Sequence, residues 1–285
     1  MKNVILVPTD FSKNAWTATV YAANLATKHS WKLHILHTYQ EFSNTRTGIR
    51  FTEEIRASVL DTALQRMKQL ETDLQTKFPG LVVTSACMLG DLSKTVLDLL
   101  RTDHYNFLIM GTKGAGRIKS ATIGSNTFEL IKKSPIGVVA IPEEYHDFKL
   151  EKIGMLTNFK ESEAQLLHSF TARIQATLNL TLLHVTEKEE SPAMSDIEFW
   201  KEQISQRFAV NNVDYCEKNA VYRLDYNMPI PKCIDWMIEK TAIDLLLVSY
   251  NRKSFFTKLF SRSLAQTIAH NVSLPTFFIR SDLKT

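Results

Sequence analysis

The chain has 285 residues, of which 44% are hydrophobic and 22% are charged, which is typical of one large or two ordinary globular domains rather than a disordered or fibrous protein. The net charge of +4 is too small to indicate nucleic-acid binding. Three widely spaced cysteines argue against a disulfide framework or a thiolate zinc site, and no apolar run is long enough for a membrane span, so we expect a cytoplasmic protein.

Short apolar runs and helical patterns alternate along the first half of the chain. The expected order is a strand at 4–7, a helix at 13–29, a strand at 33–38, a helix at 55–78, a strand at 81–87, a helix at 92–102, a strand at 106–111, a helix at 125–133 and a strand at 137–141. The strand runs are continuously apolar, which is typical of parallel strands covered on both faces. A polar segment at 40–51 is a candidate lid.

The second half of the chain repeats this pattern. Residues 152–158 resemble 4–10, residues 181–185 resemble 33–38, and residues 245–249 resemble 107–111, in the same order and at offsets of about 140–150 residues. A helix is expected at 161–178 and a last strand at 276–279, and the polar stretch containing Tyr145, His146 and Asp147 is interpreted as a linker. We therefore predict a tandem duplication of two doubly wound α/β domains with parallel sheets, at 1–146 and 147–285.

A glycine-rich loop separates the strand at 106–111 from the next helix. Four of the nine glycines lie there: Gly111, Gly114, Gly116 and Gly124. Glycine permits backbone conformations and close approach that a Cβ would prevent. The free N–H groups expected at Gly124 and Ser125, the hydroxyl of Ser125 and the positive end of the helix favour an anion. The loop therefore predicts a phosphate site.

Two familiar nucleotide motifs do not fit this loop. A Walker A loop would need Lys and Ser or Thr where Arg117 and Ile118 stand. A Rossmann fingerprint would follow the first strand and would need a third glycine where Lys119 stands. Both motifs are therefore excluded.

The spacing that fits is G-x2-G-x9-G-[ST], formed by Gly111, Gly114, Gly124 and Ser125. This pattern resembles the ATP-binding signature of the universal stress protein family. The opening strand and turn at 7–12 and the end of the second strand at 36–38 are similar to the same family. The resemblance covers the whole chain as a tandem pair of such domains, which it implies to be Rossmann-like.

The resemblance implies that five residues surround the nucleoside. Asp10 would hydrogen-bond the ribose, beside a wall formed by Pro8 and Thr9. Thr38 would meet the adenine through its backbone, and Met110 would pack near the base or the sugar.

The resemblance also implies a path for the phosphates. They would lie along Gly111 and Gly114 and end at the helix N-terminus formed by Gly124, Ser125 and Asn126. The implied ligand is ATP, with ADP or AMP as alternatives, together with a divalent cation such as Mg²⁺. No metal site made of protein ligands alone is expected, because the histidines show no paired-ligand spacing.

The second copy departs from the signature. Its aligned residues are Asn158, Ser249, Arg252 and Arg262, and only Ser125 has a counterpart, in Ser263. Arginines would fill the space that a triphosphate needs, so we expect this copy to bind no nucleotide; a smaller anion is the alternative.

Plain structural roles remain open for some of these residues. Ser125 could cap its helix, with Asn126 and a later glutamate completing a capping box. Asp10 could be an N-cap or a turn residue. His37 and His184 occupy equivalent places in the repeat, so we expect both to be structural.

The function implied is that of an ATP-binding regulatory protein of the stress response, in which nucleotide in the first domain changes partner interactions. Alternatives are an enzyme with slow ATP hydrolysis and autophosphorylation, or a nucleotide-free interaction scaffold. No base, arginine finger or Walker-type aspartate is evident, so we expect no enzyme beyond slow hydrolysis. The resemblance implies that a pseudo-twofold axis relates the domains as an internal pseudo-dimer, with further dimerisation open and with neither nucleic acid nor membrane as a partner.

Overall fold

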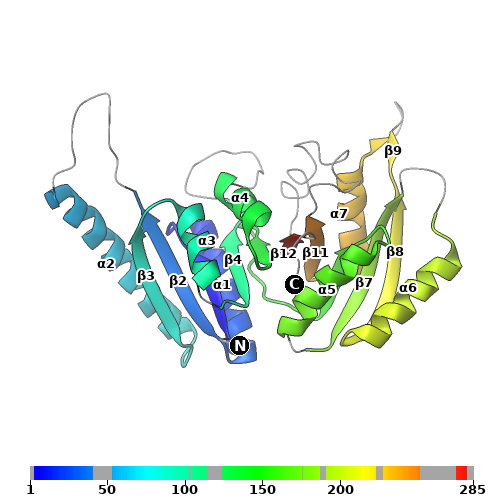
Figure 1. The fold of residues 1–285 in the computed structure, drawn as a ribbon, viewed down its shortest axis with the longest axis horizontal. Coiled ribbons are helices and arrows are strands. Elements are labelled where there is room, and N and C mark those ends of the chain that lie inside the picture. Colours follow the sequence, from blue (N-terminus) through cyan, green and yellow to red (C-terminus); the bar gives the residue numbers. More distant parts are fainter. Residues whose placement is uncertain are drawn as a thin grey trace. The chain divides into compact units, whose positions relative to one another are not determined.

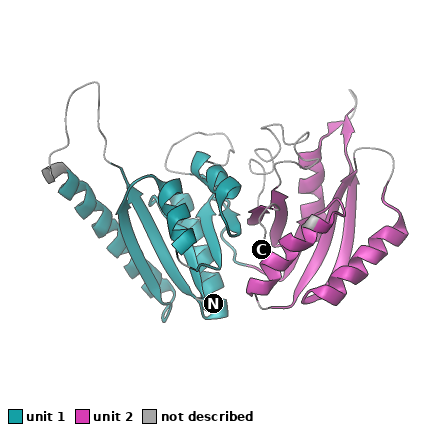
Figure 2. Ribbon diagram, in the orientation of Figure 1, with its two compact units in different colours: residues 1–117, 124–148 teal, residues 118–123, 149–285 magenta. Residues whose placement is uncertain are grey.

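The computed structural model describes residues 3–40, 53–102, 104–113, 124–174, 176–186, 191–222, 227–250 and 274–280 (Figure 1). They form two compact units, whose described residues fall within 3–148 and within 149–280 (Figure 2). The segment 40–51, apart from its first residue, lies outside the described residues, as do Gly114 and the region from 251 to 273. No described helix is both long enough and apolar enough to cross a membrane.

Unit 1 is a five-stranded parallel sheet with helices between its strands. Its elements are β1 (Val4–Pro8), α1 (Lys13–His29), β2 (Lys32–Tyr39), α2 (Glu53–Lys77), β3 (Val83–Leu89), α3 (Leu92–Thr102), β4 (Phe107–Gly111), α4 (Ser125–Lys133) and β5 (Val138–Ile141). The strand order is β3-β2-β1-β4-β5, and every neighbouring pair is parallel. The chain therefore runs outward from β1 to β3 and then returns to place β4 on the other side of β1.

Unit 2 repeats this topology. Its elements are β6 (Lys152–Leu156), α5 (Glu161–Ile174), β7 (Leu178–Thr186), α6 (Met194–Arg207), β8 (Val210–Asn219), β9 (Val221–Tyr222), β10 (Asn227–Met228), α7 (Ile230–Thr241), β11 (Leu245–Tyr250) and β12 (Thr276–Arg280). The strand order β8-β7-β6-β11-β12 corresponds element by element to that of unit 1, and these strands are again parallel. The predicted fold class, two tandem doubly wound α/β domains, is confirmed.

Two local predictions were wrong, and one pair of strands was missed. The helix expected at 161–178 ends at Ile174, and Leu178 already begins β7, in which Leu178 and the continuous run 180–183 are buried. The strand expected at 81–87 is shifted to Val83–Leu89, because the Leu81 N–H closes the turn after α2 by donating to the carbonyl of Phe78 (3.2 Å). The antiparallel pair β9–β10 was not predicted.

The core of unit 1 lies on both faces of its central strands. Every residue of β4 is buried, as is β1 from Ile5 onward. The long helix α1 packs against these strands and buries ten of its seventeen residues. Because the strands are covered on both faces, a ligand can reach the sheet most readily at the ends of the strands.

Candidate functional site

The carboxyl ends of β1 and β4 mark the point in unit 1 where the strand order reverses. The loop after β1 leads to α1, and the loop after β4 leads to α4. Ligands of open α/β sheets bind at such a switch point, because the two loops diverge and leave a crevice between them. Three adjacent strands bring Pro8 (β1), Thr38 (β2) and Met110 (β4) toward this edge; Pro8 and Met110 are buried, and Thr38 is half-buried.

The turn after β1 is held by its own side chains. The Thr9 hydroxyl accepts a hydrogen bond from the N–H of Phe11 (3.0 Å), and Phe11 has the left-handed φ of 60°. Asp10 Oδ1 accepts from the N–H of Ser12 (3.0 Å), and Ser12 Oγ in turn caps α1 by accepting from Ala15 (3.2 Å). Asp10 is thus a turn residue and not the N-cap of the helix, so one of the two structural alternatives is confirmed and the other is wrong.

A buried amide beside the loop, that of Asn14, was missed by the sequence reasoning. The Asn14 side chain is 2% exposed; its Nδ2 donates to the carbonyl of Ile141 (2.9 Å) and its Oδ1 accepts from the N–H of Lys113 (2.6 Å). A Cβ at Gly111 would lie 2.7 Å from both Cγ and Oδ1 of Asn14. Glycine at 111 is therefore required by packing against α1, whether or not a phosphate approaches.

The buried position of Asn14 could have been predicted from the sequence. It stands four residues before Ala18 and eight before Ala22, on the stripe of α1 that faces the core. A polar residue on such a stripe must find hydrogen-bond partners, because an unpaired amide is costly to bury. In the second copy the residues aligned with Asn14 and Gly111 are Ser162 and Ser249, so a larger strand residue accompanies a smaller helix residue.

The glycine loop returns to the sheet at the start of α4. The N–H of Gly124 donates to the carbonyl of Thr112 (2.7 Å), and the Thr127 hydroxyl donates to the carbonyl of Gly111 (2.9 Å). Gly124 is the N-cap and Ser125 the first helical residue, so the structural alternative in which Ser125 caps the helix does not apply. The N–H of Gly124 was expected to be free, and it is engaged by Thr112 instead.

The first turn of α4 nevertheless retains the features of an anion site. Among the described residues, no side chain makes a capping hydrogen bond to α4, whose first turn contains no acidic residue. The first N–H groups of a helix have no intrahelical acceptor and carry the positive end of the dipole. Ser125 and Asn126 are both exposed there. Of the ten predicted site residues, Gly114 alone lies outside the described residues.

The two histidines hold equivalent turns. His37 Nδ1 lies 2.8 Å from the carbonyl oxygen of Thr9, and His184 Nδ1 lies 2.8 Å from that of Thr157. A carbonyl can only accept, so in both rings Nδ1 carries the proton. The Phe11 ring packs on His37 with centroids 4.5 Å apart. The predicted structural role of both histidines is confirmed.

The corresponding turn of unit 2 contains an internal carboxylate. Glu163, 4% exposed, accepts hydrogen bonds from the hydroxyl of Thr157 (2.5 Å) and from the N–H groups of Asn158 (3.0 and 3.1 Å) and Lys160 (3.3 Å). Burial raises the pKa of Glu163, and these hydrogen bonds oppose the rise without cancelling it. At the offset of 148 residues its counterpart in unit 1 is Ala15. In unit 2 the N–H groups of Asn158 and Lys160 in the turn are therefore already bonded to the carboxylate of Glu163.

The predicted loss of the second site can be followed only in part. Arg252, Arg262 and Ser263 lie outside the described residues, whereas Ser249 lies half-buried in β11. Besides the loss of the glycine signature, the two copies differ at Glu163, and an alignment of the two halves could have identified this difference. No group of three or more His, Cys, Asp or Glu side chains suited to a metal ion occurs in the described ranges.

Comparison with known proteins places these observations in a family. Residues 1–142 match the model of the Universal stress protein family. A universal stress protein of Methanocaldococcus jannaschii is 23% identical over 156 residues, which are 50% of this chain and 95% of that protein. One from Thermus aquaticus is 25% identical over 142 residues, which are 50% of this chain and 99% of that protein.

A solved structure extends the likeness in fold to both units. The crystal structure of a universal stress protein from Archaeoglobus fulgidus DSM 4304 has a TM-score of 0.70 and covers 98% of this chain and 97% of that chain. The sequence identity is 15%, so the likeness concerns the fold.

Proposed function

Because the chain belongs to the universal stress protein family, which its N-terminal half matches, we propose that unit 1 binds an adenine nucleotide, and ATP in particular. We further propose that occupancy of this site regulates a protein partner in the stress response. The observation that carries the proposal is a hydrogen bond between the two described ends of the glycine loop. The hydrogen bond from Gly124 to Thr112 joins the uncapped start of α4 to the end of β4, next to β1 and its following Asp10.

The residues at this edge fit the parts of a nucleotide. The N–H groups of Ser125 and Asn126, with the Ser125 hydroxyl, are donors of the kind that bind phosphate oxygens. The Asp10 carboxylate can accept from ribose hydroxyls, and its Oδ1 already lies at the turn after β1. Pro8 and Met110 supply apolar surface for the sugar or base, and the backbone of Thr38 supplies polar groups for the adenine.

A divalent cation would arrive with the nucleotide. Mg²⁺ takes oxygen ligands, keeps several waters and is usually bound through phosphates and one or two carboxylates. Among the described residues of this edge, Asp10 offers a carboxylate and Ser125 a hydroxyl. This donor set suits an ion held mainly by phosphates rather than by the protein alone.

The contrast between the units supports a single nucleotide site per chain. In unit 2 the Glu163 carboxylate accepts from the N–H groups of Asn158 and Lys160 in the turn after β6. A second negative group at that turn would be repelled, and Asn158 replaces the ribose-binding aspartate. We propose that unit 2 contributes a partner-binding scaffold and no nucleotide site.

The proposal is tested by the small molecules that the protein carries and binds. The chain is purified without added nucleotide and denatured, and the supernatant is analysed by mass spectrometry. About one ATP per chain supports the regulatory function. ADP or AMP in its place favours the alternative of slow hydrolysis. An empty protein that also fails to bind Mg·ATP or a cyclic nucleotide in calorimetry leaves the scaffold alternative.

A single substitution tests whether the nucleotide binds at the predicted residues. Gly124→Arg copies the second half of the chain and should weaken Mg·ATP binding at least tenfold, because the side chain occupies the space at the start of α4. Gln75→Arg adds the same charge to an exposed position near the end of α2 and should change nothing. Unchanged affinity in Gly124→Arg, with the far-ultraviolet circular dichroism of the wild type, would show that the site has been misplaced.

A further inference from the structure

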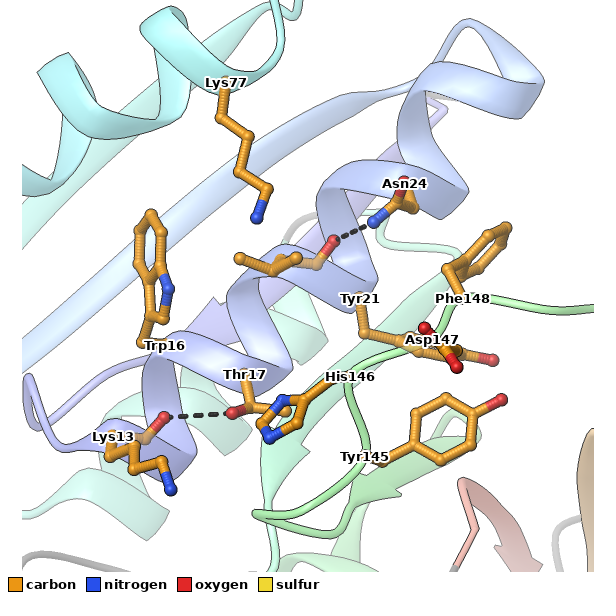
Figure 3. A pocket seen from close by; sticks show the side chains of 11 residues that line it. Lys13, Trp16, Thr17, Tyr21, Asn24, Lys77, Tyr145, His146, Asp147 and Phe148 are labelled. Carbon is orange, nitrogen blue, oxygen red and sulfur yellow. Dashed lines mark hydrogen bonds between the residues drawn. The ribbon is translucent and has the colours of Figure 1, made fainter.

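A hollow of unit 1 lies on the face of α1 that does not contact the sheet (Figure 3). Its volume is about 310 Å³, at the lower end of the range that small-molecule sites occupy. Six lining residues come from two adjacent rows of α1, in which successive members are four positions apart: Lys13, Thr17 and Tyr21 in one row, and Trp16, Val20 and Asn24 in the other. The other walls are Lys77 of α2 and the segment 145–148.

The segment after β5 contacts α1 through polar and aromatic side chains along one side of the hollow. The Thr17 hydroxyl donates to the carbonyl of Glu143 (3.2 Å), and the ammonium of Lys13 lies 3.7 Å from the Glu143 carboxylate. The ring of the buried Tyr21 packs edge-on against Tyr145 (6.0 Å between centroids) and Phe148 (5.0 Å). The sequence interpretation saw only a linker here; in the structure the segment is also the wall of a cavity.

The walls combine aromatic rings with one cation that lacks an acidic partner. Trp16 is neither buried nor packed in the core, and it lies on the same side of α1 as Lys77, whereas Phe148 lies on the other side, beside Tyr21 (Figure 3). Lys77 extends from α2 and directs its ammonium toward α1 (Figure 3). Within the described ranges Lys77 makes no ion pair, whereas Lys13 is shared between Glu143 and a neighbouring glutamate. The hollow therefore offers aromatic surface and a localised positive charge.

The second copy lacks these features. At the offset of 148 residues, Trp16 corresponds to Ala164, Tyr21 to Ser169 and Lys13 to Glu161. Ala164 and Ser169 are buried, so α5 carries no aromatic wall at these positions. The duplicated helices thus both bury an apolar stripe, in which Ala18, Ala22 and Ala26 align with Leu166, Phe170 and Ile174, and they differ in the residues that line the hollow.

We propose that this hollow is a binding site for a small aromatic carboxylate, with its ring against Trp16 and its carboxylate at the Lys77 ammonium. A flat ring of one or two cycles matches the volume, and burying it would cover the exposed part of the indole. An ammonium at the edge of an apolar wall selects for an anionic group on that ring. Asp147, also part of the lining, lies toward Phe148 and away from Lys77 (Figure 3). The site is separate from the strand ends where the nucleotide is proposed.

The probe for this site is 3-phenylpropionate, observed by saturation-transfer NMR on the full chain. We expect the acid to bind. The neutral amide, 3-phenylpropionamide, should have an affinity at least tenfold lower. Lys77→Gln should weaken binding of the acid by a similar factor and leave the weak binding of the amide unchanged. Lys68→Gln removes a lysine from an exposed position of the same helix and should bind like the wild type. Lys77 is exposed, so its replacement leaves the fold intact.

Three results would overturn the proposal. The first is no saturation transfer to the acid, and the second is equal affinity of wild type and Lys77→Gln. The third is displacement of the acid by saturating Mg·ATP, which would place the probe in the nucleotide site. Binding that survives Mg·ATP and is lost in both Lys77→Gln and Trp16→Ala would establish the second site, even if the chain binds no nucleotide.

Discussion

Replacing Gly111 by alanine tests whether this glycine serves packing as well as any ligand. The added Cβ would lie 2.7 Å from Cγ and Oδ1 of Asn14, against an ordinary contact distance of about 3.4–4 Å. The strand cannot move away easily, because Gly111 is paired with Ile141 of β5. The Asn14 side chain must therefore rotate or be compressed.

The cost can be worked out from the bonds of Asn14. Rotation would break its hydrogen bonds to Ile141 and Lys113, each contributing about 1 kcal/mol net, and would leave buried polar groups unpaired. Compression alone costs about 1–3 kcal/mol in well-packed cores. We expect Gly111→Ala to lower the free energy of unfolding of unit 1 by about 2–4 kcal/mol.

A double-mutant cycle with Asn14→Ala isolates this contact. In that background the alanine at 111 has space, and its cost should fall below about 1 kcal/mol, giving a coupling energy of about 2 kcal/mol. Urea unfolding is followed by fluorescence with Trp200 and Trp236 changed to phenylalanine, so that the signal reports unit 1. An equal cost of Gly111→Ala in both backgrounds would refute the packing argument.

Three further changes test the turns and the loop. Ser12→Ala removes the cap of α1 and should destabilise unit 1 by about 0.5–2 kcal/mol in the same assay, whereas no loss would mean that water replaces the hydroxyl. Thr127→Val leaves the buried carbonyl of Gly111 unpaired and should cost about 1–3 kcal/mol, with faster amide exchange near Thr112; unchanged exchange would contradict this. Burial raises the pKa of Glu163, so its stabilisation of unit 2 is fully present below the unfolded pKa and is lost as the pH rises through the folded pKa. The difference in unfolding free energy between wild type and Glu163→Gln should therefore shrink from pH 4 to pH 7; a growing difference would mean that the four hydrogen bonds outweigh burial.

Local periodicity determined most of the elements from the sequence. The helices expected at 13–29, 92–102 and 125–133 have those bounds in the structure, because their apolar spacing and end signals act within a few residues. The repeat of the pattern at nearly one offset predicted two copies of one fold. The expected strand ends differ from those in the structure, as at Val83, because a strand begins where a partner offers hydrogen bonds and not where its own residues change.

Only the tertiary structure decided how the candidate site is held together. Gly111 and Asn14 are 97 positions apart, so nothing in the local sequence reveals that one must be small because the other is buried against it. The donor at Gly124 was assigned to a ligand from its spacing, yet the fold gives it to Thr112. Glu163 and Lys77 acquire their roles from surroundings assembled by distant segments. Residue types and spacing carry the chemistry that a site can perform, whereas packing and hydrogen bonding between segments decide which of those groups remain available.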